Sequence, residues 1–174
     1  MSFIVWMGVL MASANNAIYD QAITTIEGKK TTLSEYKGKP LLVVNIATHC
    51  GYTPQLSGLE QIYQKYKSKG LVVVGIPSNE FGGQTPEKDG DVKTFCKVHH
   101  GVTFPLTSKT NVLGPQKSPV VKWLLEQGPS QKEIGWNFEK FLVSADGKVA
   151  ARFESSVKPD STELVSAIEK MIKK

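Results

Sequence analysis

A buried strand, a helix and a second buried strand follow one another closely, and this order constrains the fold more than any other feature. The apolar run from Leu41 to Ile46 is rich in β-branched residues, as is typical of a strand covered on both faces of a parallel sheet. Apolar residues then recur at helical spacing until Gly70, and a second apolar run reaches Ile76. This spacing predicts a βαβ unit with parallel strands and a right-handed crossover.

Cys50 lies where the first of these strands gives way to the helix. Thr53 is the expected N-cap and Pro54 the first helical residue, where the missing N–H of proline costs nothing. The free N–H groups and macrodipole of a helix N-terminus favour a thiolate over a thiol, so Cys50 is a candidate nucleophile. The alternative is that Cys50 is a small buried hydrophobic residue, which is a common fate of a lone cysteine.

Other apolar patterns predict strands and helices on either side of this unit. Residues 18–33 are typical of a β-hairpin with a glycine-containing turn, which we expect to cover one edge of the sheet. A second hairpin joins residues 138–143 to residues 149–153, and a further short strand is expected at 102–106. The predicted class is α/β, with a central mixed β-sheet flanked by three helices.

Composition and charge argue against several kinds of site. The formal net charge is +5, but the lysines are scattered and no patch combines arginine with aromatic residues, so we expect no nucleic-acid partner. The chain has no C-x-x-C, Walker or G-x-G-x-x-G pattern. His49, His99 and His100 lack ligand spacing with the cysteines. We therefore expect no metal and no bound cofactor.

Residues 1–17 precede the predicted hairpin and allow two interpretations. Residues 3–11 are almost wholly apolar, and residues 12–14 have the small-x-small form of a cleavage site. If residues 1–14 are a signal peptide, the protein is periplasmic or exported. No lysine or arginine precedes Lys29, which instead favours a disordered extension and a cytoplasmic protein. The apolar run is too short to cross a bilayer, so we expect no stable membrane insertion.

Three neutral hydrogen-bond donors later in the chain suggest what Cys50 could attack. Gln84 ends a polar, glycine-rich loop after the second strand, at the edge where sites of open α/β sheets collect. Trp136 and Asn137 precede a later strand. Taken singly, each fits a loop or packing residue, but together they can stabilise the alkoxide that leaves when a peroxide O–O bond breaks. Acyl transfer would need a histidine base, and His49 is expected to point away from Cys50.

The second cysteine, Cys96, follows the helical intervals set by Val92 and His99, so we expect it on a helix, facing inward or partly exposed. Residue types and spacing leave three states open for Cys50 and Cys96. They could form a structural disulfide, act as a redox pair or remain two free thiols.

Three sequence blocks resemble the glutathione peroxidase family in order and spacing. They are N-I-A-T-H-C-G-Y-T-P-Q at Asn45–Gln55, P-S-N-E-F-G-G-Q at Pro77–Gln84 and W-N-F-E-K-F-L-V at Trp136–Val143. The chain is most similar to the cysteine-containing bacterial branch, and the resemblance extends from about Ile18 to the C-terminus. It implies a single domain with a thioredoxin-like fold over residues 18–174.

The resemblance also implies an enzyme: a thiol-dependent peroxidase that reduces hydrogen peroxide and organic or lipid hydroperoxides. Cys50 would be the peroxidatic cysteine, with Gln84, Trp136 and Asn137 as its polar shell. Cys96 lies on the helix that carries the resolving cysteine of members reduced by thioredoxin, which implies thioredoxin as the reductant. Two alternatives stay open: a one-cysteine enzyme reduced by glutathione, and a redox sensor that passes its disulfide to a partner protein.

The sequence departs from the family pattern at two places. Ser78 and Glu80 stand where many relatives read P-C-N-Q-F, so no cysteine can resolve from that position. Thr48 and His49 replace the commoner Ser-Lys pair, which removes one positive charge beside the nucleophile. The short linker at 130–135 resembles that of monomeric members, so the resemblance implies a monomer.

Overall fold

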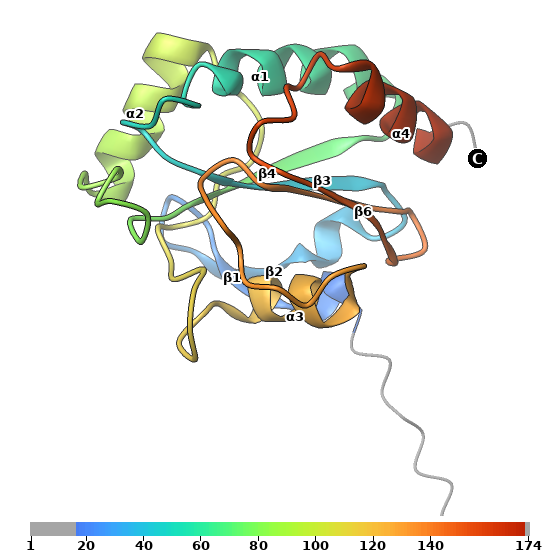
Figure 1. Ribbon diagram of the computed structural model, residues 1–174, viewed down its shortest axis with the longest axis horizontal. Coiled ribbons are helices and arrows are strands. Elements are labelled where there is room, and N and C mark those ends of the chain that lie inside the picture. The colour runs from blue at the N-terminus through green and yellow to red at the C-terminus, as the bar shows by residue number, and fades with distance from the viewer. Residues whose placement is uncertain (1–16, 173–174) are drawn as a thin grey trace, which may run out of the picture.

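A four-stranded mixed sheet forms the centre of the computed structural model, which describes residues 17–172 (Figure 1). Its strands are β3 (Leu41–Ile46), β4 (Val72–Pro77), β5 (Lys140–Val143) and β6 (Val149–Phe153), in the order β4-β3-β5-β6. β3 pairs with β4 in parallel, whereas the β3–β5 and β5–β6 pairs are antiparallel. The predicted βαβ unit and the hairpin of β5 and β6 are therefore confirmed.

Four α-helices cover the two faces of this sheet. Figure 1 shows α1 (Gln55–Tyr66), α2 (Asp89–His100) and α4 (Thr162–Ile172) on one face, and α3 (Pro119–Gln127) on the other. Our expectation of three helices is wrong, since residues 17–172 contain four. The helix expected around Cys96 is α2, which is mostly polar and buries only Val92 and Cys96. Within the described residues, none of these helices is long and apolar enough to cross a membrane.

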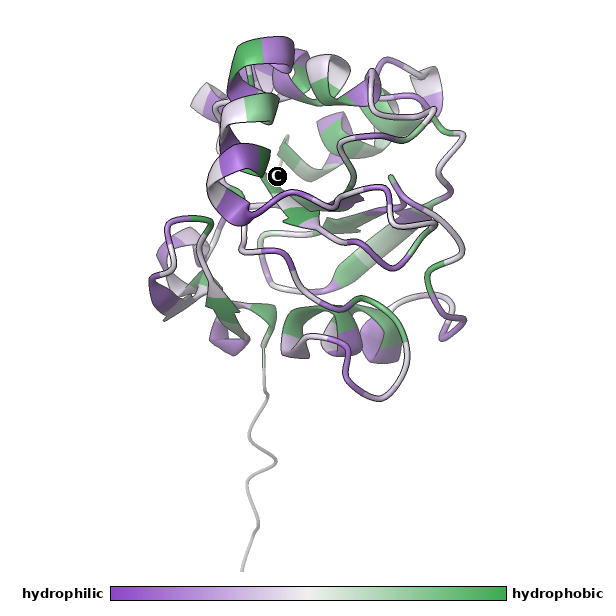
Figure 2. Ribbon diagram, turned by 90° about the vertical axis from the view of Figure 1, so that its left-hand side faces the viewer, coloured by the Kyte–Doolittle hydropathy of each residue, from purple (hydrophilic) through white to green (hydrophobic). Residues whose placement is uncertain are grey.

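Alternation along the strands divides the apolar core into two clusters, one on each face of the sheet. Leu42 and Val44 point into the cluster beneath α1, α2 and α4, which also contains Cys50 and Cys96. Val43 points into the cluster beneath α3. In Figure 2 the central strands are largely green and the helices alternate green and purple, as expected for amphipathic helices around a buried sheet.

The predicted N-terminal hairpin forms a separate two-stranded antiparallel sheet of β1 (Ala22–Thr24) and β2 (Lys30–Thr32). Thr25 bridges to Thr107, and the neighbouring Leu106 bridges to Gly75 of β4, so the hairpin covers the β4 edge through this segment. The strand expected at 102–106 is reduced to these isolated bridges, because Pro105 has no N–H to offer a ladder.

The ends of the chain lie partly outside this description. Ile18–Asp20 is a short 3₁₀ turn and not the first part of the predicted strand. The interpretation of residues 1–14 as a signal peptide, or of residues 1–17 as an extension, concerns residues almost wholly outside the described range of 17–172.

Candidate active site

Cys50 lies in a tight turn between β3 and α1. Thr53 fixes this turn, since its hydroxyl donates to the Ala47 carbonyl at 3.0 Å and accepts from the Cys50 N–H at 2.9 Å. The Tyr52 N–H donates to the Cys50 sulfur at 3.4 Å. Our expectation that Thr53 caps α1 is wrong, because its hydroxyl is used within the turn and the helix begins after Pro54 without a side-chain cap.

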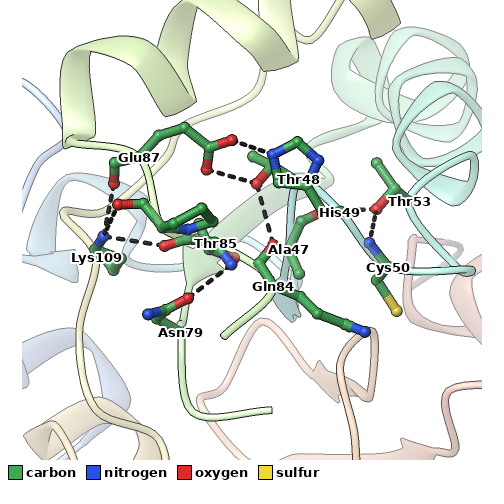
Figure 3. A network of polar contacts seen from close by, with 11 residues as sticks. Ala47, Thr48, His49, Cys50, Thr53, Asn79, Gln84, Thr85, Glu87 and Lys109 are labelled. Carbon is green, nitrogen blue, oxygen red and sulfur yellow. Dashed lines mark hydrogen bonds and ion pairs between the residues drawn. The ribbon is translucent and has the colours of Figure 1, made fainter. Parts of the chain in front are cut away.

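Gln84 and Asn137 form a direct amide pair. The Asn137 Nδ2 donates to the Gln84 Oε1 at 2.9 Å, and the Asn137 residue is fully buried. This bond orients the Gln84 amide, because an oxygen held by one partner leaves the nitrogen to face the other way. Figure 3 shows the Gln84 side chain extending toward the side on which the Cys50 sulfur lies.

Trp136 and Asn137 belong to a short segment that two buried residues hold in place. Asn45 donates from its side-chain Nδ2 to the Trp136 carbonyl at 3.1 Å, and its backbone carbonyl accepts from the Phe138 N–H at 2.7 Å. Lys140 donates from Nζ to the Phe138 carbonyl at 2.7 Å. Phe138 has φ of 68°, which is uncommon for a residue other than glycine and is maintained by these contacts.

The Trp136 side chain lies at the surface beside the site. It is 40% exposed, and its ring packs against Phe81 with a centroid separation of 5.5 Å. Phe81 is itself buried, so the pair presents one aromatic face to solvent over an apolar support. The Trp136 side chain is therefore partly open to solvent, whereas the neighbouring Asn137 is buried.

Cys96 lies on α2 with its side chain turned fully inward. It is 0% exposed, and burial raises the pKa of its thiol to about 11, with the nearby Glu87 charge acting in the same direction. Both Cys50 and Cys96 are free thiols, so the structural disulfide is not formed in this structure. A redox pair and two independent thiols stay open.

The His49 side chain contacts the carboxylate of Glu87, which lies outside the turn that carries Cys50 (the cysteine turn, residues 47–53). Its Nε2 forms an ion pair with Glu87, its side chain is 57% exposed, and its ring lies against Phe95. This arrangement does not supply the histidine base that acyl transfer needs. Across residues 17–172 there is no group of three or more potential ligands that could hold a metal ion.

Comparison with known proteins decides the family. The family model for glutathione peroxidase matches residues 18–125. The chain belongs to the glutathione peroxidase family. A hydroperoxy fatty acid reductase of Synechocystis is 41% identical and covers 94% of this chain and 100% of its own length. A glutathione peroxidase-like peroxiredoxin of Chlamydomonas reinhardtii is 44% identical, covering 91% of this chain and 98% of its own.

Solved structures agree with this family and with the predicted fold. The apo form of Trgpx matches with a TM-score of 0.75 at 35% identity, covering 92% of this chain and 98% of that one. T. cruzi GPX1 matches with a TM-score of 0.72 at 28% identity, and the match covers 90% of this chain and 97% of that one. A thioredoxin family protein of Chlorobium tepidum shares the fold alone, with a TM-score of 0.59 at 19% identity over 87% of this chain and 90% of that one. This member of the family therefore has a thioredoxin-like α/β fold and is a thiol-dependent peroxidase.

Three residues that shape the site were not predicted: Asn45, Glu87 and Lys140. Two of them carried a signal, since Asn45 interrupts the apolar run of β3 and Lys140 is the first residue of β5, directly before its apolar residues. A polar residue in a buried strand needs a partner, so such interruptions mark candidate positioning residues. Glu87 carried no comparable signal, because it lies in a polar loop.

Proposed function

We propose that this peroxidase reduces hydrogen peroxide and organic or lipid hydroperoxides at Cys50, that Cys96 resolves the product, and that thioredoxin recycles the enzyme. The observation that carries the proposal is the Gln84–Asn137 amide pair, which leaves a neutral donor on the side of the Cys50 sulfur. The names of the relatives support the substrate class: one is a hydroperoxy fatty acid reductase, and another is a peroxiredoxin.

In the first step the Cys50 thiolate attacks the terminal oxygen of the hydroperoxide. The O–O bond breaks, a sulfenic acid forms on Cys50, and the alkoxide leaves and takes up a proton. Gln84, Trp136 and Asn137 are the proposed donors. Neutral N–H groups aimed at the leaving oxygen stabilise the charge that develops on it, without a proton relay.

In the second step the Cys96 sulfur attacks the sulfenic sulfur of Cys50, water leaves, and a disulfide forms. A dithiol of thioredoxin then reduces this disulfide by thiol–disulfide exchange. Because Cys96 is buried in α2, the second step requires that helix to open locally. The same burial favours a second candidate function, in which glutathione attacks the sulfenic acid directly and Cys96 only packs in the core.

The partly exposed Trp136 ring, which packs on the buried Phe81, supports the proposal that large apolar hydroperoxides are substrates as well as hydrogen peroxide. An aromatic face open to solvent on the residue before Asn137 can receive an acyl chain without enclosing it. A monomer is proposed as well: among residues 17–172, the large hydrophobic side chains left exposed are Val98 and Trp136, too few for a stable subunit interface.

The test is NADPH consumption with hydrogen peroxide, coupled either to thioredoxin and its reductase or to glutathione and its reductase. We expect turnover with thioredoxin for the wild type, and loss of it in both Cys50→Ser and Cys96→Ser. Equal turnover with glutathione in the wild type and in Cys96→Ser would establish the one-cysteine enzyme. A single oxidation without sustained turnover under either system would identify a redox sensor instead.

A further inference from the structure

The loop that carries Gln84 contains no regular secondary structure and is held in place by individual hydrogen bonds to other segments. Residues 78–88 join β4 to α2 and contain neither helix nor strand. Yet the Gln84 carbonyl is tied directly to the cysteine turn, since it accepts from the Thr48 N–H at 3.2 Å and from the His49 N–H at 2.9 Å. The position of Gln84 relative to Cys50 therefore depends on contacts between two non-regular segments.

Glu87 binds both residues that hold Gln84. One carboxylate oxygen accepts from the Thr48 hydroxyl at 2.7 Å, and the other forms the ion pair with His49 (Figure 3). Although burial acts to raise the pKa of the Glu87 carboxyl, hydrogen bonds from Thr48 and His49 lower it below its ordinary value. The carboxylate thus stays charged and joins the cysteine turn to the loop three residues beyond Gln84.

The Thr48 hydroxyl has two acceptors within hydrogen-bond distance. It lies 3.1 Å from the Gln84 carbonyl and 2.7 Å from the Glu87 carboxylate, but it carries a single proton. The shorter contact to the charged acceptor is the stronger one. Thr48 is 4% exposed, so water competes poorly for this bond. Loss of Glu87 would leave the Thr48 hydroxyl to the Gln84 carbonyl alone and would remove the two contacts that hold residue 87 of the loop to Thr48 and His49.

Lys109 closes the opposite side of the same loop. Its Nζ donates to the carbonyls of Thr85, Pro86 and Glu87 at 3.0, 3.4 and 2.6 Å. The loop is thereby fixed from two directions, by Lys109 on one side and by the cysteine turn on the other (Figure 3). Lys109 bonds to backbone carbonyls and leaves the Glu87 side chain free to reach Thr48 and His49.

We propose that Glu87 is a positioning residue of the peroxidase: acting through Thr48 and His49, its carboxylate holds Gln84 against Cys50. The inference rests on the proposed function, in which Gln84 donates to the peroxide. It assigns a use to His49, which stands next to the nucleophile and takes no part in the proton transfers. Misplacement of a donor by about 1 Å can cost on the order of 100-fold in rate, so a side chain that anchors a loop without regular secondary structure affects the reaction.

A double-mutant cycle with Gln84 tests this inference. The measured quantity is the rate at which hydrogen peroxide oxidises Cys50 in a single turnover, in a Cys96→Ser background. We expect Glu87→Gln to slow this step by about 10- to 100-fold when Gln84 is present. In Gln84→Ala the same substitution should cause no further slowing, because residues that act through one another are not additive.

Two further variants complete the design. Thr48→Val removes one of the two Glu87 contacts and should reproduce part of the loss, which keeps the test open if Glu87→Gln fails to fold. Glu126→Gln is the matched control, because Glu126 forms an exposed ion pair with Lys122 on α3, away from the site. Its rate should equal that of the parent.

The outcomes separate this inference from the function on which it rests. A parent-like rate in both Glu87→Gln and Thr48→Val overturns the role of Glu87, and so does an equal loss in the Gln84→Ala background. A parent-like rate in Gln84→Ala alone overturns the proposed donor role of Gln84, and the inference about Glu87 falls with it.

Discussion

At the scale of single residues, Lys140 is a cation within the core beside the site. It is 0% exposed on β5, pairs with Val44 and Phe153 on the neighbouring strands, and donates to the Phe138 carbonyl. Burial lowers the pKa of its ammonium to about 8, while the adjacent Glu139 charge opposes this shift. The amine therefore stabilises the strained Phe138 segment at a cost in desolvation.

That cost predicts a dependence of stability on pH. The pKa is about 8 in the folded protein and 10.5 for an ordinary lysine, so between these values the unfolded chain binds more protons and stability rises with pH. The wild type should gain about 3 kcal/mol relative to Lys140→Met as pH rises from about 7 to about 10.5. Urea unfolding of both proteins across this range measures the difference, and parallel stability curves would contradict it.

The indole N–H of Trp136 gives a second prediction at this scale. Trp136→Phe keeps an aromatic ring against Phe81 but removes the donor, so Cys50 oxidation should slow by about 10- to 1000-fold, as for loss of a transition-state donor. Stopped-flow measurement of the first turnover gives this rate. Gln61→Ala, on the exposed side of α1, is the control. A Phe variant as fast as the control would mean that Trp136 contributes packing and no hydrogen bond.

At the scale of elements, α2 combines well-stabilised ends with a small buried face. Asp89 and Asp91 lie in its first turn and Lys97 in its last, which suits the helix dipole. Gly101 ends the helix with φ of 67°, and its N–H donates to the Lys97 carbonyl at 3.0 Å. Because few apolar residues anchor α2 in the core, it is the element best suited to open locally.

Loosening the end of α2 should therefore speed the second chemical step. Gly101→Ala forces a side chain into the left-handed region at a cost of about 1 kcal/mol, and an added Cβ would meet no neighbouring atom within 4 Å. If α2 must open locally before Cys96 attacks the sulfenic acid of Cys50, formation of the Cys50–Cys96 disulfide should accelerate by about fivefold. The rate of sulfenic acid formation should stay unchanged. Gly28→Ala, at a left-handed position in the hairpin turn, is the control.

Mass spectrometry of quenched, alkylated samples follows both steps. A disulfide rate in Gly101→Ala equal to that in the Gly28→Ala control would mean that the end of α2 does not limit the approach of Cys96. A different part of α2 would then have to open before Cys96 could reach Cys50.

At the scale of the whole molecule, the site joins three segments far apart in the sequence: residues 45–53, 84–87 and 136–140. Periodicity predicted the strands and helices that carry these segments. The family resemblance predicted a shared site of Cys50, Gln84, Trp136 and Asn137, of which the structure joins Gln84 and Asn137 by a hydrogen bond. The contacts that hold them were not predictable in the same way. Thr53 was read as a helix cap, yet its hydroxyl serves the cysteine turn, because the tertiary path of residues 47–50 supplies nearer partners.

The contacts of Glu87 could not be predicted from the sequence. Its partners, Thr48 and His49, lie 39 and 38 residues earlier, and no periodic pattern relates the loop at 84–88 to the turn at 47–54. The register between such segments follows from how the whole sheet and its helices pack. Local patterns therefore predict regular elements well, whereas polar contacts between loops follow only from the assembled fold.

The most direct test of the account is to trap the oxidised nucleophile. Cys96→Ser would be exposed to one equivalent of hydrogen peroxide in the presence of dimedone, and the modified residue located by peptide mass spectrometry. We expect a dimedone adduct on Cys50 in Cys96→Ser. In the wild type treated without dimedone, we expect a Cys50–Cys96 disulfide. Peroxide consumption by Cys50→Ser at the wild-type rate, or an adduct only at another residue, would contradict it.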